Sequence, residues 1–187
     1  MSKQALLVID LQNDYFPGGN WPLVNPDAAA DNAARLIADF RAKGAPVVHV
    51  RHESGEADAS FFVPGSKGAE INAKVAARPN EPVIVKNNIN AFRDTDLKQV
   101  LDKNGITDLV IVGAMSHMCV DGASRAAVDF GYSTTVIHDA CATHDQEFNG
   151  VKVPAAQVHA AFMAGLAFGY AAVKSTEEFL AAGKAAA

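Results

Sequence analysis

The sequence predicts an α/β protein, a three-layer α/β/α sandwich in which helices cover both faces of a mostly parallel sheet of about six strands. Short continuous apolar runs, typical of strands buried on both faces, alternate along the chain with longer amphipathic stretches typical of helices. Such alternation favours parallel strands joined by helical crossovers. The 187 residues, 49% of them hydrophobic, suffice for one compact domain over 1–187. The Ala-rich tail from about residue 181 is expected to be poorly ordered, as a fraying helix or a disordered segment.

Three strands and one long helix are predicted in the first half of the chain. The helix covers 27–43, where apolar residues recur at helical spacing and Gly44 supplies a stop. Two irregular segments interrupt the alternation: a Pro- and Gly-rich loop with three aromatic residues over 13–26, and a long polar excursion over 51–80. The predicted strands are 5–9 (ALLVI), 46–50 (PVVHV) and 82–85 (PVIV).

The second half of the chain continues the alternation with three helices and three strands. The first helix follows Thr95, which is well placed as its N-cap. The second begins near Met118 and ends at about residue 130, and the third covers about 154–169. The predicted strands are 109–112 (LVIV), 134–138 (TTVIH) and a short one near 171–174.

Cys119 lies just inside the start of the second of these helices. Unpaired backbone N–H groups and the positive end of the helix dipole favour a thiolate there, which makes Cys119 a candidate nucleophile. A free cysteine is equally often a small buried hydrophobe, and this stretch alone leaves both alternatives open. Cys141 has nothing basic placed to activate it and is predicted to be structural. Two cysteines make no disulfide framework, so we expect both thiols to be reduced.

Two further reactive side chains stand at equivalent places. Asp10 directly follows the first strand and Lys86 follows the third. Because the carboxyl ends of parallel strands meet at one edge of the sheet, both are expected close to Cys119. Asp10 can serve as the base for the thiol, Lys86 can stabilise the thiolate, and backbone N–H groups of the 113–119 turn can bind an oxyanion. The alternative is a structural salt bridge between Asp10 and Lys86.

Three motifs resemble the isochorismatase-like cysteine hydrolases, a superfamily that includes nicotinamidases, carbamoyl-amide hydrolases and isochorismatases. They are ALLVIDLQNDYF, VIVKNNINAF, and LVIVGAMSHMCVDGASRAAVDFGY followed by VIHDACAT, in the family's order and spacing over nearly the whole chain. The resemblance implies a Rossmann-like sandwich with a catalytic triad of Asp10, Lys86 and Cys119. It also implies a cis peptide bond at Ala114-Met115 and an oxyanion hole formed by the N–H groups of Met115 and Cys119.

The sequence departs from the nicotinamidases where these bind a divalent metal, through an Asp-x-His pair after the second strand and a further His. That place here is His49-Val-Arg-His52-Glu53-Ser54, which lacks the pair. His52, Glu53 and His117 are suitable ligand types, but their spacing matches no recognised site. We therefore expect no catalytic metal and no other cofactor. His49 is predicted to face the core.

A nucleophilic cysteine favours attack on an amide or carbamoyl carbon over the vinyl ether cleavage of isochorismatases. In the expected reaction Cys119 is acylated, Asp10 protonates the departing amine, ammonia being the expected leaving group, and water hydrolyses the thioester. An ether hydrolase of isochorismatase type and a non-catalytic binding protein on the same fold are the alternatives. Candidate substrate contacts are aromatic and histidine side chains near the predicted strand ends: Phe16, Trp21, His52, Phe61, Phe62, Phe92 and His117.

The net charge of -5, with basic residues scattered along the chain, gives no indication of nucleic-acid or membrane binding. The apolar run near the N-terminus is interrupted by Asp10 and is too short for a signal peptide or a membrane span, so we expect a cytoplasmic protein. The expected partners are a small amide or carbamoyl substrate and, as the resemblance implies, further copies of the chain in a homodimer or homotetramer.

Overall fold

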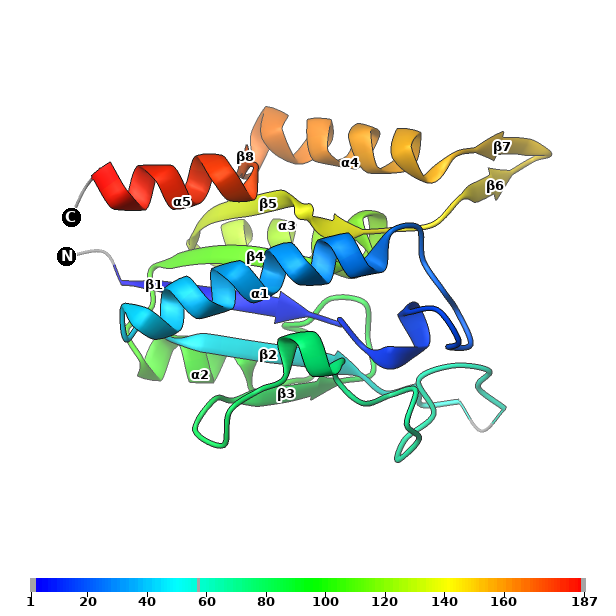
Figure 1. Cartoon of the computed structure of the whole chain (residues 1–187), viewed down its shortest axis with the longest axis horizontal. Coiled ribbons are helices and arrows are strands. Elements are labelled where there is room, and N and C mark those ends of the chain that lie inside the picture. Colours follow the sequence, from blue (N-terminus) through cyan, green and yellow to red (C-terminus); the bar gives the residue numbers. More distant parts are fainter. Residues whose placement is uncertain (1–2, 57, 186–187) are drawn as a thin grey trace.

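A six-stranded parallel sheet forms the centre of the protein, with helices on both faces (Figure 1). The computed structural model describes residues 3–56 and 58–185. The strand order is β3-β2-β1-β4-β5-β8, and every neighbouring pair is parallel. The predicted three-layer sandwich is therefore confirmed. The strands are β1 (Gln4–Ile9), β2 (Val47–His52), β3 (Val83–Lys86), β4 (Asp108–Ala114), β5 (Ser133–Ala142) and β8 (Ala172–Lys174).

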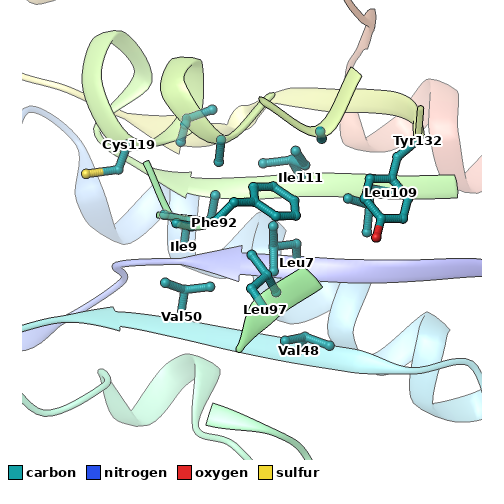
Figure 2. Packing of buried hydrophobic residues seen from close by; sticks show 14 of the residues in the cluster. Leu7, Ile9, Val48, Val50, Phe92, Leu97, Leu109, Ile111, Cys119 and Tyr132 are labelled. Atoms are coloured by element: carbon teal, nitrogen blue, oxygen red, sulfur yellow. The ribbon is translucent and has the colours of Figure 1, made fainter. Parts of the chain in front are cut away.

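Each face of the sheet has its own hydrophobic core, and β1 contributes to both. Leu6 and Val8 pack with α1 (Pro26–Ala42) and α5 (Thr176–Ala185) on one face. Leu7 and Ile9 point to the other face (Figure 2), which is covered by α2 (Leu97–Lys103), α3 (Asp121–Asp129) and α4 (Ala155–Gly169). Burial on both faces explains why β1 is apolar at every position from 5 to 9. Within the described ranges, each helix is too short or too polar to cross a membrane.

The order of the strands places a ligand crevice beside β1. The chain builds the sheet outward from β1 through β2 to β3 and then returns to place β4 on the other side of β1. The loops that leave the carboxyl ends of β1 and β4 therefore run in opposite directions. In open α/β sheets this switch point is where ligands bind. Asp10 follows β1 there, and the segment with Cys119 follows β4.

Two elements were not predicted from the sequence. A hairpin of β6 (Gln146–Phe148) and β7 (Val151–Val153) extends from the body next to α4 (Figure 1). Asn149 and Gly150 form its turn with φ values of 51° and 77°, and an Asn-Gly pair is a strong hairpin signal. The second element is α5, which begins at Thr176, before the Ala-rich tail, and continues to Ala185. Residues 186 and 187 lie outside the described ranges.

Glu81 anchors a buried polar cluster at the amino end of β3. Its two carboxylate oxygens accept hydrogen bonds of 2.7 Å from Arg41 Nε and Nη2, and Oε2 also accepts one of 2.8 Å from the Arg78 backbone. His49, predicted to face the core, is fully buried, and its Nε2 lies 3.1 Å from Glu81 Oε2. Burial by itself raises the pKa of Glu81, but the bonds from Arg41, Arg78 and His49 outweigh it and lower the pKa to about 2.

Substituting Glu81→Gln is expected to lower the free energy of unfolding at pH 7 by about 2 kcal/mol, because Arg41 loses its charged partner. A carboxyl with a lowered folded-state pKa stabilises above its unfolded pKa, near 4.5, and loses that contribution as the pH falls towards about 2. Urea unfolding at pH 7, 5 and 3 should therefore show the wild type converging on the variant in acid. Curves that stay parallel would contradict this assignment.

Candidate active site

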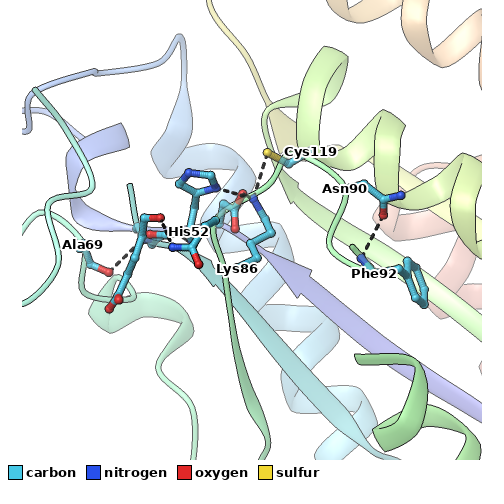
Figure 3. A network of polar contacts seen from close by, with 10 residues as sticks. His52, Ala69, Lys86, Asn90, Phe92 and Cys119 are labelled. Atoms are coloured by element: carbon cyan, nitrogen blue, oxygen red, sulfur yellow. Dashed lines mark hydrogen bonds and ion pairs between the residues drawn. The ribbon is translucent and has the colours of Figure 1, made fainter. Parts of the chain in front are cut away.

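The structure brings Asp10, Lys86 and Cys119 together at the carboxyl edge of the sheet. Figure 3 shows the contact between Lys86 and Cys119. Lys86 Nζ lies 2.8 Å from Asp10 Oδ2 and 3.3 Å from Cys119 Sγ. The side chains of Asp10 and Lys86 are fully buried, and Cys119 is 6% exposed. A carboxylate, an ammonium and a thiol therefore share one site from which nearly all water is excluded.

Local backbone structure places Asp10 and Lys86. Asp10 adopts a φ of 50°, a left-handed conformation that costs about 1 kcal/mol in a residue with a side chain and turns the chain out of β1. Its N–H still donates to the Val50 carbonyl at 2.9 Å, so the turn stays attached to β2. Lys86 is the last residue of β3 and pairs in register with His52 of β2, which directs both strand ends to the same place.

Cys119 lies in a π-helical turn, η3 (Ser116–Val120), that leads directly into α3. The helical segment therefore begins earlier than the predicted start near Met118. The peptide bond between Ala114 and Met115 that precedes this turn is cis. The N–H groups of Met118 and Val120, on either side of Cys119, both donate to the Met115 carbonyl, at 3.1 and 3.2 Å.

The side chain of Ser116 ties this turn to the rest of the domain. Its Oγ donates to the Ala142 carbonyl of β5 at 3.3 Å and lies 2.8 Å from Nδ1 of His159 in α4. The next residue, His117, places its Nδ1 2.7 Å from Thr143 Oγ1. The position of Cys119 is thus fixed by contacts with segments far away in the sequence.

Gly113 allows β4 to approach β1 where the site begins. Its φ is 132°, and a Cβ atom at this position would lie 1.9 Å from the Ile9 carbonyl oxygen. Backbone atoms cannot move aside as a flexible side chain can. Gly113 is therefore required by both its conformation and its surroundings.

Substituting Gly113→Ala is expected to lower the free energy of unfolding by about 4 kcal/mol or to prevent folding, because strain and overpacking add. Gly105→Ala is the matched control. Gly105 has a φ of 64° with no atom within 4 Å of an added Cβ, so only the backbone penalty of about 1 kcal/mol applies. Chemical denaturation measures both, and equal losses would show that close approach to Ile9 is unimportant.

The protonation state of the site differs from the one that the helix start suggests. Burial, followed by the charge of Asp10, raises the pKa of the Cys119 thiol to about 12, although Lys86 acts in the opposite direction. Burial alone disfavours the Lys86 ammonium, but the charges of Asp10 and Cys119 outweigh it and raise the pKa of Lys86. In the free protein at neutral pH, the sulfur is therefore protonated and Lys86 is charged. A base must take the thiol proton as sulfur attacks.

Asp10 is placed to be that base. It is held near Lys86 by charge and proximity, since within the described residues neither Asp10 oxygen accepts a hydrogen bond of good geometry. A carboxylate oxygen that accepts no hydrogen bond has lone pairs available to accept the thiol proton. The charge of Asp10 also acts on Tyr15, whose pKa is raised by burial and then by Asp10 and Cys119, so that its hydroxyl stays protonated.

A continuous chain of aromatic rings connects the two sides of the site. It begins at His52, whose Nδ1 lies 2.9 Å from Lys86 Nζ, and it ends two residues before Cys119. Successive ring centroids are 4.6 to 6.4 Å apart. The rings are, in order, those of His52, Phe62, Tyr15, Phe61, Trp21, His144 and His117.

Two of the candidate substrate contacts lie outside this ring chain. Phe92 is buried in the hydrophobic core (Figure 2), with its ring 5.3 Å from that of Phe130 and 6.1 Å from that of Tyr132. Phe16 is 6% exposed and belongs to the hydrophobic core on the face of the sheet that α1 covers. Cys141 is buried, and burial raises its pKa to about 12, in keeping with a structural role.

Gln12 and Asp14 support the site and were missed in the sequence. Gln12 is fully buried; its Oε1 accepts from the His52 N–H at 2.7 Å, and its Nε2 donates to the carbonyls of His52 and Ala69 at 2.8 Å. Asp14 Oδ2 accepts from the Phe62 N–H at 2.6 Å. These bonds attach the long 51–80 excursion to the segment after β1. The available signal was the placement of two polar residues directly after Asp10.

In the part of the chain that the structure describes, no group of three or more His, Cys, Asp or Glu side chains is arranged to hold a metal ion. The cluster of His52, Glu53 and His117 considered above is not formed there. Glu53 instead pairs with Arg51, while His52 contacts Lys86 and His117 contacts Thr143.

Comparison with known proteins identifies relatives of this chain. A model of the isochorismatase domain matches residues 4–176. The uncharacterized isochorismatase family protein YddQ of Bacillus subtilis is 51% identical over 176 residues, which cover 94% of this chain and 98% of YddQ. Streptothricin hydrolase of Streptomyces noursei is 37% identical over 144 residues, which cover 76% of this chain and 50% of that protein.

A solved structure gives the same result for the fold. The crystal structure of a protein from Oleispira antarctica, assigned to the isochorismatase hydrolases, superposes with a TM-score of 0.93. The two chains are 58% identical, and the superposition covers 96% of this chain and 97% of the other. The chain therefore belongs to the isochorismatase-like cysteine hydrolase superfamily.

Proposed function

We propose that the protein hydrolyses the C–N bond of a small amide or carbamoyl compound through a thioester on Cys119. The observation that carries this proposal is the contact of one buried ammonium, Lys86 Nζ, with both the Asp10 carboxylate and the Cys119 sulfur. The nucleophile, its base and a fixed positive charge are thus within reach of one reacting carbon. The relative from Streptomyces noursei is a hydrolase, which supports hydrolysis as the class of reaction.

In the acylation half-reaction, Cys119 Sγ attacks the carbonyl carbon while its proton moves to Asp10. The oxyanion that forms accepts hydrogen bonds from the N–H groups of Met115 and Cys119, a contribution of about 3 kcal/mol per donor. The C–N bond then breaks, and Asp10 gives the proton to the departing amine, which leaves as ammonia from a primary amide. Lys86 keeps Asp10 in place and stabilises the sulfur as its proton leaves.

In the second half-reaction, water attacks the thioester carbonyl carbon and gives a proton to Asp10. The C–S bond breaks, the carboxyl product leaves, and the proton returns to the Cys119 sulfur. No external oxidant or reductant is needed. Because a thiol attacks an electrophilic carbonyl carbon, Cys119 favours amide chemistry over cleavage of a vinyl ether. The chain of aromatic rings from His52 to His117 favours a flat or partly apolar substrate.

The test is a screen for ammonia release from a panel of primary amides, carbamates and ureido compounds, together with a vinyl ether whose cleavage is followed by chromatography of its products. We expect turnover of at least one amide or carbamoyl compound, and acid-quenched samples should contain protein heavier by the acyl group. Turnover of the vinyl ether alone, unaffected by Cys119→Ala, would favour the ether hydrolase. Tight binding of a panel member without turnover would favour the non-catalytic alternative. Assembly into a homodimer or homotetramer stays a prediction, which the mass of the protein in solution tests.

A further inference from the structure

Lys86 has a third neighbour besides Asp10 and Cys119. Its Nζ lies 2.9 Å from Nδ1 of His52 (Figure 3). Contacts with Asp10, Cys119 and His52 therefore converge on one buried ammonium. A lysine ammonium has three N–H groups and no acceptor. Two of these contacts, with His52 Nδ1 and Cys119 Sγ, are hydrogen bonds, and the third, with Asp10, is an ion pair of 2.8 Å.

This contact fixes the tautomer of His52. Because Lys86 can only donate, Nδ1 must be without a proton to approach within 2.9 Å, and the neutral ring then carries its proton on Nε2. Burial and, after it, the charge of Lys86 lower the pKa of His52, so the ring is neutral at pH 7. Both the geometry and the electrostatics make His52 an acceptor for Lys86.

The backbone of His52 is held independently of this contact. Gln12 binds both its N–H and its carbonyl, at 2.7 and 2.8 Å, and Gln12 is itself fixed by the Ala69 carbonyl. The ring of His52 packs against Phe62 with centroids 5.9 Å apart. His52 is thus a rigid acceptor supported by the segment after β1, whereas the four-carbon stem of a lysine is flexible.

We propose that His52 is a positioning residue of the site, which takes the third N–H of Lys86 and so directs the other two at Asp10 and Cys119. This inference rests on the proposed function, since it explains how Lys86 serves two partners at once. Without His52, the N–H group that it accepts loses its partner, and the ammonium of Lys86 can turn towards Asp10 or water and away from Cys119. The sulfur would then lose part of its stabilisation as its proton leaves.

The first measurement is direct. Nitrogen-15 NMR of the histidine rings at pH 7, with His52 assigned by its loss in His52→Asn, is expected to show a neutral ring protonated at Nε2. A charged ring, or a proton on Nδ1, would overturn the proposal.

The second measurement is the rate at which iodoacetamide modifies Cys119 at pH 8 in the wild type, His52→Leu and His52→Asn. Leucine removes the acceptor, and we expect modification about tenfold slower, the loss of one hydrogen bond to a charged group. An asparagine side-chain oxygen can occupy the place of Nδ1, so His52→Asn is expected to recover most of the rate. A merely structural histidine would not be rescued in this way.

His49→Leu is the matched control, because it removes another buried histidine of β2 whose partner is Glu81. His49→Leu is expected to be less stable than the wild type, but its Cys119 should be modified at the wild-type rate. Equal rates in His52→Leu and the wild type, or equal losses in His52→Leu and His52→Asn, would overturn the proposal. Neither measurement needs turnover: if no amide is hydrolysed while the rates follow the expected order, the proposed function fails and the role of His52 stands.

Discussion

Replacing Cys119 with serine is expected to lower kcat/KM for the best amide substrate by about ten-thousandfold. The thiol is already hard to ionise in this site, where its pKa is about 12, and a hydroxyl in the same place is harder still. The available base is the Asp10 carboxylate, which is so weak that deprotonation of an alcohol would add greatly to the activation free energy. Cys119→Ser should still fold and bind substrate, because the two side chains have similar shapes.

The matched control for this experiment is Cys141→Ala. Cys141 is also buried, and its sulfur donates to the Ile137 carbonyl at 3.3 Å. The Cys141→Ala variant is expected to have a lower free energy of unfolding than the wild type and to keep most of the turnover. Mass spectrometry after acid quenching should detect the acyl adduct in the wild type and in Cys141→Ala, and not in Cys119→Ser. More than about one per cent residual activity in Cys119→Ser would contradict nucleophilic catalysis by this residue.

The convergence of Asp10, Lys86 and Cys119 could be predicted because it follows from a rule of topology. The carboxyl ends of parallel strands lie at one edge of the sheet, so residues at or shortly after the ends of three strands are brought to that edge. The apolar run before Asp10 and the charge of Lys86 after another apolar run are local signals. The fold class could be predicted from the same strand pattern.

The chemical state of the site could not be predicted in this way. The local argument from the helix start favours a Cys119 thiolate, but burial and Asp10 dominate in the folded protein and keep the sulfur protonated. Gln12 was missed because its side chain joins His52 and Ala69, which are 40 and 57 residues away in sequence. Phe92 was considered for the pocket because aromatic residues near strand ends suit both pocket and core, and only packing separates the two.

Replacing Asp10 with asparagine is expected to abolish turnover and also to lower the free energy of unfolding by about 3 to 5 kcal/mol. The side chains of Asp10 and Lys86 are both fully buried, so the variant leaves an ammonium without its counter-charge in a site that water does not reach. Loss of turnover alone would not separate a catalytic base from a structural salt bridge, the alternative that the sequence left open.

The double variant Asp10→Asn with Lys86→Met separates the two roles. Removing both charges removes the desolvation cost of each, so unfolding in urea should show most of the lost stability restored. Turnover should stay abolished, because stability does not replace the proton transfers that Asp10 performs. A double variant that regained turnover would show that the pair only supports the fold. If the loss of stability in the double variant equalled the sum of the losses in the two single variants, the two charges would not interact. That result would contradict the 2.8 Å contact between them.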